Sequence, residues 1–459
     1  MNPAIFLGRL GGQKSPWLWL CLAGMSMRSL AEAESPTNAV EVLSPARVNA
    51  WVTVMETNHP ALRAAQARAR SADWNAQGIR RLADPKVLLG GTVYSSKGNN
   101  PADEGNLIYG IEQPLPVFGK EAAAQSVATA DAATEAARAT ARFQELRRDL
   151  AQALFQAALA RRVVLVARED QAWLAEIVRT LEARFSTGNA TQVEVLRAQT
   201  ELARRAVEVE NLQSKEAEAL GAVNRRLGRD PLAPLPGFDL PGLAEPVTYS
   251  ERLVRLAINA EPRLRVLATE RRAAEAVVEA TRRSQRPDLA LGVDGRQYSG
   301  DGGFREGTFG LSINFPWWNR AKYRRDLARD RERLRAVEDE HADSALGLHE
   351  EVHHLTLEIA AARREALLFQ DDLRPRTERT FSVALALWSS GRGELRDVFE
   401  SRRLLLDTQV QFARAVAAQW TALAELVLCC GLADLEALEM LGRETAEPTP
   451  SNTNSSQRL

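Results

Sequence analysis

Four segments of the chain alternate apolar and polar residues with the period of a β-strand. In the last of them, Phe309, Leu311 and Ile313 alternate with small or polar residues, so the three apolar side chains share one face. Such segments form either a half-buried sheet or strands that turn an apolar face to lipid and a polar face to a lumen. The predicted strands are residues 86–96, 106–115, 288–299 and 307–315, of which the first is the least regular.

Most of the remaining sequence predicts helices, two of them very long. Residues 120–184 contain no Pro or Gly, and residues 320–388 contain only Gly347 and Pro375. A helix of this length would extend ~100 Å at ~1.5 Å per residue, far beyond an ordinary globular helix. Shorter helices, which together match the long ones in length and are expected to lie antiparallel to them, are predicted at about 59–83, 190–228, 261–285 and 393–430.

The order helix, strand, strand, long helix, shorter helix occurs twice. Pro60 and Pro262 each open a helix, where the missing proline N–H costs nothing. The hairpin glycines Gly188 and Gly391 keep nearly the same offset. Because the period is about 200 residues, the repeated unit is half of one body rather than a solenoid repeat.

The predicted organisation follows from this duplication. A polar tail with two prolines follows the second copy. A stretch with five prolines separates the copies, cannot form a regular helix and is expected to cross the outside of the molecule as a linker. The expected parts are a signal peptide at 1–33, a first repeat at 34–228, a Pro-rich linker at 229–246, a second repeat at 247–443 and a disordered tail at 444–459.

The first 33 residues have the features of a secretory signal. Basic residues precede the apolar run 17–23, and Ala31-Glu32-Ala33 is a small-x-small cleavage site. Lipidation of Cys21 is an alternative, although Leu20 is bulky for the position before a lipidated cysteine. No later run reaches the ~18 apolar residues of a membrane helix, so any membrane crossing is expected from strands.

Composition and charge narrow the function. The formal net charge is −1, which argues against a nucleic-acid partner. No phosphate-binding glycine loop or nucleophile triad is found, and no cofactor is expected. Four strands cannot close a barrel, and open strand edges are not tolerated in lipid. If the strands cross a membrane, the chain must therefore oligomerise.

Several motifs resemble the TolC family of outer-membrane efflux proteins. They cover residues 45 to 432 in the family's order, and their duplication makes the resemblance specific. The two strand-to-helix turns also resemble the CzcC-like heavy-metal efflux branch. The motifs are residues 58–62 (Asn-His-Pro-Ala-Leu), 113–120 (Gln-Pro-Leu-Pro-Val-Phe-Gly-Lys), 184–191 (Arg-Phe-Ser-Thr-Gly-Asn-Ala-Thr) and 315–320 (Phe-Pro-Trp-Trp-Asn-Arg).

The resemblance implies an α+β fold and an assembly. Members are homotrimers in which each chain gives four strands to a twelve-stranded outer-membrane β-barrel and its long helices to a periplasmic helical barrel. They are passive exit ducts that work with a periplasmic adaptor protein and an inner-membrane efflux pump. We therefore expect the outer membrane of a Gram-negative bacterium as the location and outer-membrane lipid as a partner.

The resemblance also marks candidate site residues at the periplasmic tips. The hairpins bearing Gly188 and Gly391 are expected to contact the adaptor. Asp397 and Glu400 occupy positions where acidic residues form constrictions in some members. In the first copy, the gate candidate Glu194 occupies a place where an acidic residue can pair across the tip. Rings of like charge in a pore favour cations. The alternative is that Asp397 and Glu400 belong to a solvated helix face together with neighbouring arginines.

Two other functions remain open. His349-Glu350-Glu351-Val352-His353 fits the pattern of zinc metalloproteases, which places two histidines on one helix face. The motif lacks an evident third ligand, so a surface metal site or a plain polar face are alternatives. The chain could also be a structural coiled-coil protein of the periplasm, although such a rod has no need of the strand pairs.

Overall fold

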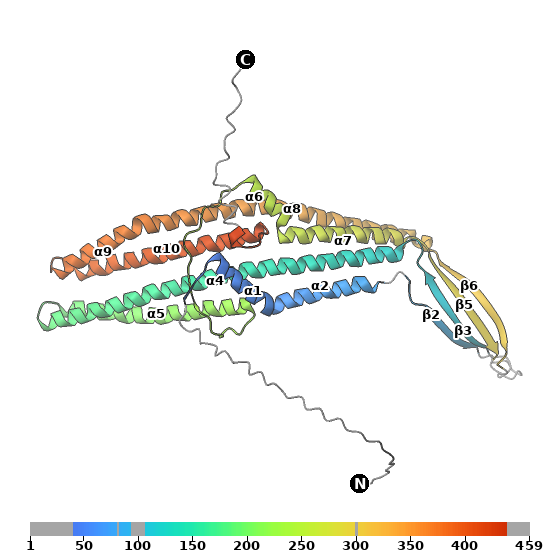
Figure 1. The fold of residues 1–459 in the computed structure, drawn as a ribbon, viewed down its shortest axis with the longest axis horizontal. Coiled ribbons are helices and arrows are strands. Elements are labelled where there is room, and N and C mark those ends of the chain that lie inside the picture. The colour runs from blue at the N-terminus through green and yellow to red at the C-terminus, as the bar shows by residue number, and fades with distance from the viewer. Residues whose placement is uncertain (1–39, 80–81, 93–105, 299–301, 438–459) are drawn as a thin grey trace, which may run out of the picture.

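The computed structural model describes residues 40–79, 82–92, 106–298 and 302–437. Over these residues the molecule is elongated, with a sheet at one end and two helical hairpin tips at the other (Figure 1). The predicted signal peptide at 1–33 and tail at 444–459 lie outside the described residues.

The elements of the first half appear in the order expected for one repeat, with three additions. They are β1 (Val40–Val42), α1 (Pro45–Asn58), α2 (Pro60–Gly78), β2 (Lys86–Thr92), β3 (Asn106–Leu115), α4 (Lys120–Ser186), α5 (Gln192–Leu227) and β4 (Gly237–Asp239).

The second half repeats this order, which confirms the internal duplication. Its elements are α6 (Glu251–Ala260), α7 (Pro262–Ser284), β5 (Asp288–Tyr298), β6 (Phe304–Asn314), the 3₁₀ turn η1 (Pro316–Asn319), α8 (Arg320–Leu367), the π-helical turn η2 (Leu368–Leu373), α9 (Arg374–Ser389) and α10 (Leu395–Cys429).

Two predicted boundaries and the continuity of one predicted helix are wrong. Helix α2 ends at Gly78 rather than near 83, because the chain is already extended at Ile79. Strand β6 begins at Phe304 rather than 307. The second long helix is not uniform, because η2 precedes Pro375. Proline lacks an N–H and its ring crowds the carbonyl four residues earlier, and a π turn relieves this mismatch.

The four long strands form one antiparallel sheet in the order β2-β3-β5-β6. The central β3–β5 pairing joins the two repeats, with Ile111 opposite Val293. Strands β2 and β6 are the two edges of the described sheet. Gly110 lies close to the neighbouring strand, since an added Cβ would meet Asp294 Cβ at 2.8 Å.

The two faces of this sheet differ in polarity along its length. Across the register, Leu89, Tyr109, Val293 and Phe309 lie on one face with other exposed apolar side chains. The opposite face carries an ion pair between Arg296 Nη1 and Glu306 Oε1 at 2.9 Å. The predicted alternation is therefore realised as one continuous apolar face and one polar face.

The main hydrophobic core lies in the middle of the long axis, where α1 and α6 cross the long helices (Figure 1). Phe155 of α4 contacts Trp420 of α10, with ring centroids 5.6 Å apart. Both helices α1 and α6 begin at a serine N-cap: Ser44 Oγ accepts from Arg47 N and Ser250 Oγ accepts from Leu253 N. These caps stabilise the N-termini of two helices that the repeat pattern did not predict.

The Pro-rich linker is held against this core rather than crossing freely over the outside. Strand β4 within it pairs in parallel with β1, and Phe238 is buried at 1% exposure. The buried Gln419 side chain donates to Ala244 O at 3.0 Å and accepts from Ala244 N at 3.2 Å. Trp420 Nε1 donates to Gly242 O. The linker therefore ties the second repeat to the core of the first.

Two helices are long and apolar enough to span a membrane by length and average composition, although neither contains an uninterrupted run of 18 apolar residues. Windows of 18 residues in α4 and α10 reach mean hydropathies of 1.4 and 1.3. These windows are 50% and 72% buried within the chain. Such burial is expected of core helices, and the two windows are weak evidence for a membrane span.

Candidate functional site

The first hairpin tip is built from a Schellman-type turn between α4 and α5. Gly188 has φ 78°, a left-handed conformation that favours glycine. Gly188 N donates to Phe185 O at 3.0 Å, and Asn189 N donates to Arg184 O at 2.8 Å. These bonds satisfy the last carbonyls of α4 and reverse the chain.

Glu194 caps the helix that follows this turn. Thr191 N donates to Glu194 Oε2 at 2.8 Å, and Glu194 N donates to Thr191 Oγ1 at 3.3 Å. Two helix-terminal N–H groups are thereby satisfied in a reciprocal capping box. The carboxylate predicted as a gate candidate is thus engaged at the start of α5, where a negative charge is stabilised by the helix dipole.

The second tip repeats the turn but not the cap. Gly391 has φ 74°, and Arg392 N donates to Leu387 O at 2.9 Å. Asp397 occupies the sixth position after Gly391, as Glu194 does after Gly188. Here the N-cap residue, Glu394, makes no side-chain cap bond, and no capping box forms. The Asp397 carboxylate is therefore not engaged in helix capping as that of Glu194 is.

Asp397 and Glu400 lie on the exposed face of α10, opposite the buried Leu395 and Val398. Glu400 Oε1 is 3.5 Å from Arg396 Nε, and both side chains are about two-thirds exposed. A surface pair of this kind is worth little on its own. Within one chain the two acids therefore form an exposed acidic pair that Arg396 neutralises only in part.

The two hairpins are joined near their tips by an aromatic contact and a buried ion-pair node. Arg184 of α4 lies over the Trp388 ring, 4.5 Å from its centroid. Farther back, the Asp170 carboxylate is buried between Arg205 Nε of α5 at 2.7 Å and Arg402 Nε of α10 at 3.1 Å. This three-helix node was not predicted, since its members are distant in sequence.

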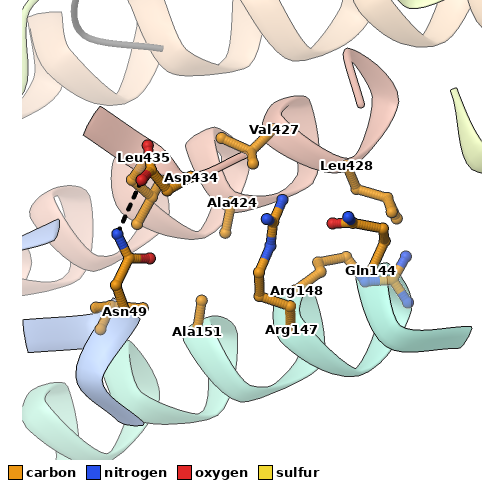
Figure 2. Close-up of a pocket in the computed structure, with 11 residues that line it drawn as sticks. Asn49, Gln144, Arg147, Arg148, Ala151, Ala424, Val427, Leu428, Asp434 and Leu435 are labelled. Atoms are coloured by element: carbon orange, nitrogen blue, oxygen red, sulfur yellow. Dashed lines mark hydrogen bonds between the residues drawn. The ribbon is translucent and has the colours of Figure 1, made fainter. Parts of the chain in front are cut away.

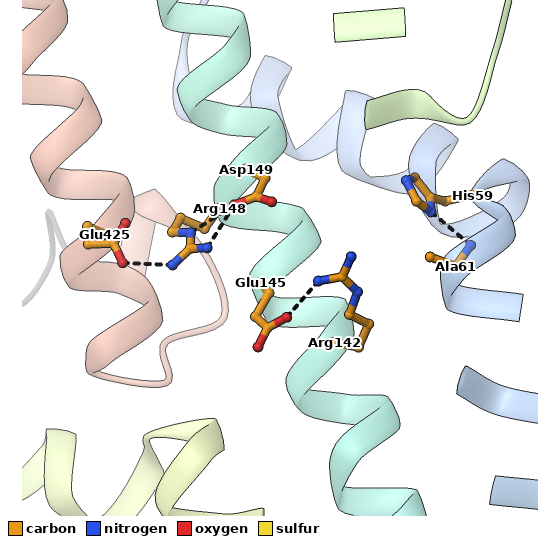
Figure 3. A network of polar contacts seen from close by, with 7 residues as sticks. All are labelled: His59, Ala61, Arg142, Glu145, Arg148, Asp149 and Glu425. Atoms are coloured by element: carbon orange, nitrogen blue, oxygen red, sulfur yellow. Dashed lines mark hydrogen bonds and ion pairs between the residues drawn. The ribbon is translucent and has the colours of Figure 1, made fainter. Parts of the chain in front are cut away.

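A second polar network lies in the middle of the long axis (Figure 3). Arg148 of α4 pairs with Asp149 at 2.8 Å and with Glu425 of α10 at 2.9 Å. Gln152 Nε2 donates to the other oxygen of Glu425 at 2.9 Å. The network ties α4 to α10, so these helices of the two repeats are joined at two separate levels, here and at Asp170.

His59, at the edge of this network, caps α2 in its neutral form. Its Nδ1 accepts from Ala61 N at 3.2 Å (Figure 3). Burial lowers the pKa of His59, and the charges of Arg142 and Arg226 lower it further. Protonation would remove the acceptor from the helix N-terminus and place a cation there, which the helix dipole opposes.

Acidification should therefore weaken the fold through His59. An unfolded histidine titrates near pH ~6.5, so stability should be constant above that value and fall as the pH drops through it toward the lower folded pKa. His59→Asn keeps a capping acceptor without titrating, and should reduce this pH dependence of the thermal unfolding midpoint. His354→Asn, at an exposed residue of α8, is the control. An unchanged pH profile in His59→Asn would remove His59 as the cause.

A small pocket lies between α1, α4 and α10 (Figure 2). It encloses about 310 Å³, part of it open to solvent. Its polar lining is already occupied: Arg147 donates to the carbonyl oxygens of Leu432 and Ala433, and Asn49 Nδ2 donates to Asp434 at 3.0 Å. These bonds fasten the chain after α10 to α4, so the pocket is part of a helix contact.

The predicted zinc pair is on an exposed face of α8. His349 and His353 are exposed, and the His353 ring packs edge-on against Tyr249 with centroids 5.0 Å apart. Among the described residues, the group of three metal-capable side chains is Glu351, Glu425 and Cys429, which includes neither histidine.

The acids of this group already have roles without a metal ion. Glu425 accepts from Arg148 and Gln152, and the Cys429 thiol lies within 4.8 Å of the Glu351 carboxylate. Burial, together with the charges of Glu351 and Glu425, raises the pKa of Cys429 far above its usual range. A buried protonated thiol is a poor metal ligand and a poor nucleophile.

Comparison with known proteins matches this architecture. The family model described as outer membrane efflux protein matches residues 51–229 and 253–432, one segment in each repeat. No curated protein matches the chain.

Solved channel structures share the fold at low identity. The outer-membrane channel OprN is 19% identical, with a TM-score of 0.72 over 84% of this chain and 89% of its own. VceC, an outer membrane protein of Vibrio cholerae, is 18% identical, with a TM-score of 0.70 over 84% and 96%. CusC is 16% identical, with a TM-score of 0.73 over 84% and 92%. Since the family model covers most of the chain in two repeats, the chain belongs to the outer membrane efflux protein family.

Proposed function

We propose that this outer-membrane efflux channel works as a homotrimer in which three four-stranded sheets close into a twelve-stranded barrel. The two edges of the sheet require such closure. Strands β2 and β6 expose unpaired backbone groups, and in lipid each unsatisfied group costs several kcal/mol, roughly. Pairing β6 of one chain with β2 of the next removes every edge when three chains form a ring.

The polarity of the sheet supports the same arrangement. Its apolar face carries large exposed side chains, including Phe309 at 86% and Leu89 at 76% exposure. An exposed apolar patch of this kind marks an interaction surface. Around a closed barrel, the acyl chains of the lipid would cover it. The polar face, with Asp294 and the Arg296–Glu306 pair, then lines a lumen that admits water.

The helices then continue the channel away from the membrane. Helices α4 and α8-η2-α9 extend from the sheet to the tips (Figure 1). We propose that the tips bearing Gly188 and Gly391 meet a periplasmic adaptor and that an inner-membrane pump delivers the exported substrate. Heavy-metal cations remain one substrate class suggested by the turns at Pro116 and Pro316. The role is passive conduction, without enzymatic activity.

At the tip, Asp397 and Glu400 are the best gate candidates. In a trimer these acids of three chains would converge, and their repulsion would be offset by arginines or by bound cations. Glu194 is the weaker candidate because its carboxylate is engaged in the capping box.

Replacing both acids by alanine tests this gate. Asp397→Ala/Glu400→Ala should abolish most of the cation selectivity of single channels in planar bilayers and weaken block by divalent cations, because the acidic ring is gone. Assembly should be unchanged. Glu340→Ala/Asp343→Ala is the matched control, since it removes two exposed acids with the same spacing from α8. Equal selectivity in the tip variant and the control would assign Asp397 and Glu400 to a solvated helix face.

Two alternative functions, a structural coiled-coil protein of the periplasm and a zinc metalloprotease, can be tested by simple observations. A monodisperse monomer in buffer without detergent would contradict the barrel. The metalloprotease needs His349 and His353 to find a third ligand, and the described residues around them provide none at ligand distance.

A further inference from the structure

The apolar face of the sheet ends in a cluster of exposed aromatic rings. Phe315 continues the alternation of Phe309 to Ile313 and is 48% exposed, and Trp317 and Trp318 follow at 52% and 93%. The rings of Phe315 and Trp317 contact each other, with centroids 5.3 Å apart. Aromatic side chains at the end of an apolar band are typical of the boundary between hydrocarbon and headgroups.

The first six residues of α8, directly beyond these rings, include four cations and no acid. Arg320, Lys322, Arg324 and Arg325 are all exposed. Within the described residues, none of the four has an acidic side chain within ion-pair distance. We refer to Arg320, Lys322, Arg324 and Arg325 as the basic collar.

Several other cations near this junction and farther along α8 are paired. Lys120 Nζ lies 2.6 Å from Asp288 Oδ1. Arg329 pairs with Asp330 at 2.7 Å. Arg335 pairs with Glu332 at 2.8 Å. The collar differs from these paired cations because it gathers four exposed cations within six residues that include no acid, next to the aromatic rings, so its charge is available to an anionic partner.

The distance from the aromatic rings to the collar suits a headgroup layer. At ~1.5 Å per residue, Arg325 lies ~9 Å along the helix from Asn319, within the Debye length of ~10 Å at 0.1 M salt. Arg286 reaches the same junction from the start of β5, where it lies over the Phe118 ring at 5.9 Å. Cations at this depth meet phosphate oxygens rather than acyl chains.

We propose that the basic collar binds the headgroups of anionic glycerophospholipids in the periplasmic leaflet. The proposal rests on the proposed membrane insertion of the sheet. Guanidinium groups donate paired hydrogen bonds to phosphate, while the aromatic rings lie at the level of the glycerol. Charge complementarity and continuity with the apolar face both favour a lipid over a protein partner here.

Native mass spectrometry of the full-length trimer in neutral detergent tests this proposal. The wild-type protein should retain phosphatidylglycerol in preference to phosphatidylcholine. Raising the salt from ~0.1 M to ~1 M, which shortens the Debye length from ~10 Å to ~3 Å, should reduce the preference. Replacing all four collar residues by glutamine should lower the ratio of the two retained lipids by about tenfold or more. The control is Arg68→Gln/Arg197→Gln/Arg379→Gln/Arg414→Gln, which removes four exposed, unpaired arginines elsewhere.

The outcomes separate this inference from the channel function. If the collar variant still inserts into bilayers and conducts but has lost the lipid preference, the proposal holds. Equal retention of the two lipids by the wild-type protein, or equal loss in the collar and control variants, overturns it while leaving the channel intact. A wild-type protein that neither trimerises nor conducts would instead refute the barrel on which the proposal depends.

Discussion

Phe309→Arg should prevent the protein from accumulating as a trimer in the outer membrane, whereas Thr308→Arg should not. Phe309 lies midway along β6 on the apolar face, opposite Val293. An arginine facing lipid at the bilayer midplane costs about 2–4 kcal/mol, and a trimer would contain three of them. Thr308 lies on the polar face opposite Asp294, where an arginine gains an acidic partner.

The measurement is the amount of heat-labile trimer in outer-membrane fractions, compared between the two variants at equal expression. Both substitutions introduce the same side chain at adjacent positions of one strand, so general effects on synthesis and secretion cancel. If both variants assembled equally well, the apolar face would not contact lipid. Failure of Thr308→Arg alone would mean that the two faces had been assigned the wrong way round.

The strand faces and the repeat could be predicted because each is a local pattern that recurs. A two-residue alternation determines which side chains share a face, and the turns at Gly188 and Gly391 need left-handed glycine in both copies. The capping box at the first tip was also predictable, since a threonine followed three residues later by glutamate is its usual pattern. Recognition of that pattern would have ranked Glu194 below the other gate candidates, because its carboxylate caps a helix.

The features that sequence reasoning missed depend on contacts between distant segments. Helices α1 and α6 follow the N-caps Ser44 and Ser250, whereas the recognised repeat begins only at Pro60 and Pro262, after these two helices. The linker was expected to cross the outside because its prolines exclude a helix. Its anchoring by Gln419 joins residues that are 175 positions apart, and no local pattern reports such a contact.

The Asp170 node is the most informative of these unpredicted contacts. Asp170 Oδ atoms bridge Arg205 and Arg402, which belong to different hairpins. The Arg402 guanidinium also lies 5.2 Å from the Trp173 ring and 5.3 Å from that of Phe381. A solitary buried carboxylate would be costly, but here two cations share it. The node therefore holds both hairpins together behind the tips, and local opening of the tip region must break it.

Asp170→Asn should loosen this region strongly, because it leaves two partly buried guanidinium groups facing a neutral amide. Losing one partner of a buried pair costs about 3–5 kcal/mol, which the residual exposure of Arg205 and Arg402 reduces to about 2 kcal/mol. Amide hydrogen exchange in α4 and α10 on either side of the node should then accelerate by about 30-fold, since 1.4 kcal/mol corresponds to a factor of ten.

The control for this effect is a surface pair on α5, the helix that carries Arg205. Glu201 lies 3.2 Å from Arg204, and the two side chains are 46% and 74% exposed. Glu201→Gln removes one acid next to the node at an expected cost below about 0.5 kcal/mol, so exchange should change less than about threefold. If Asp170→Asn behaved like this control, the bridging geometry would contribute no more than a surface pair. A large effect confined to the two hairpins would instead establish that the tips move as one unit, because a single carboxylate couples α4, α5 and α10.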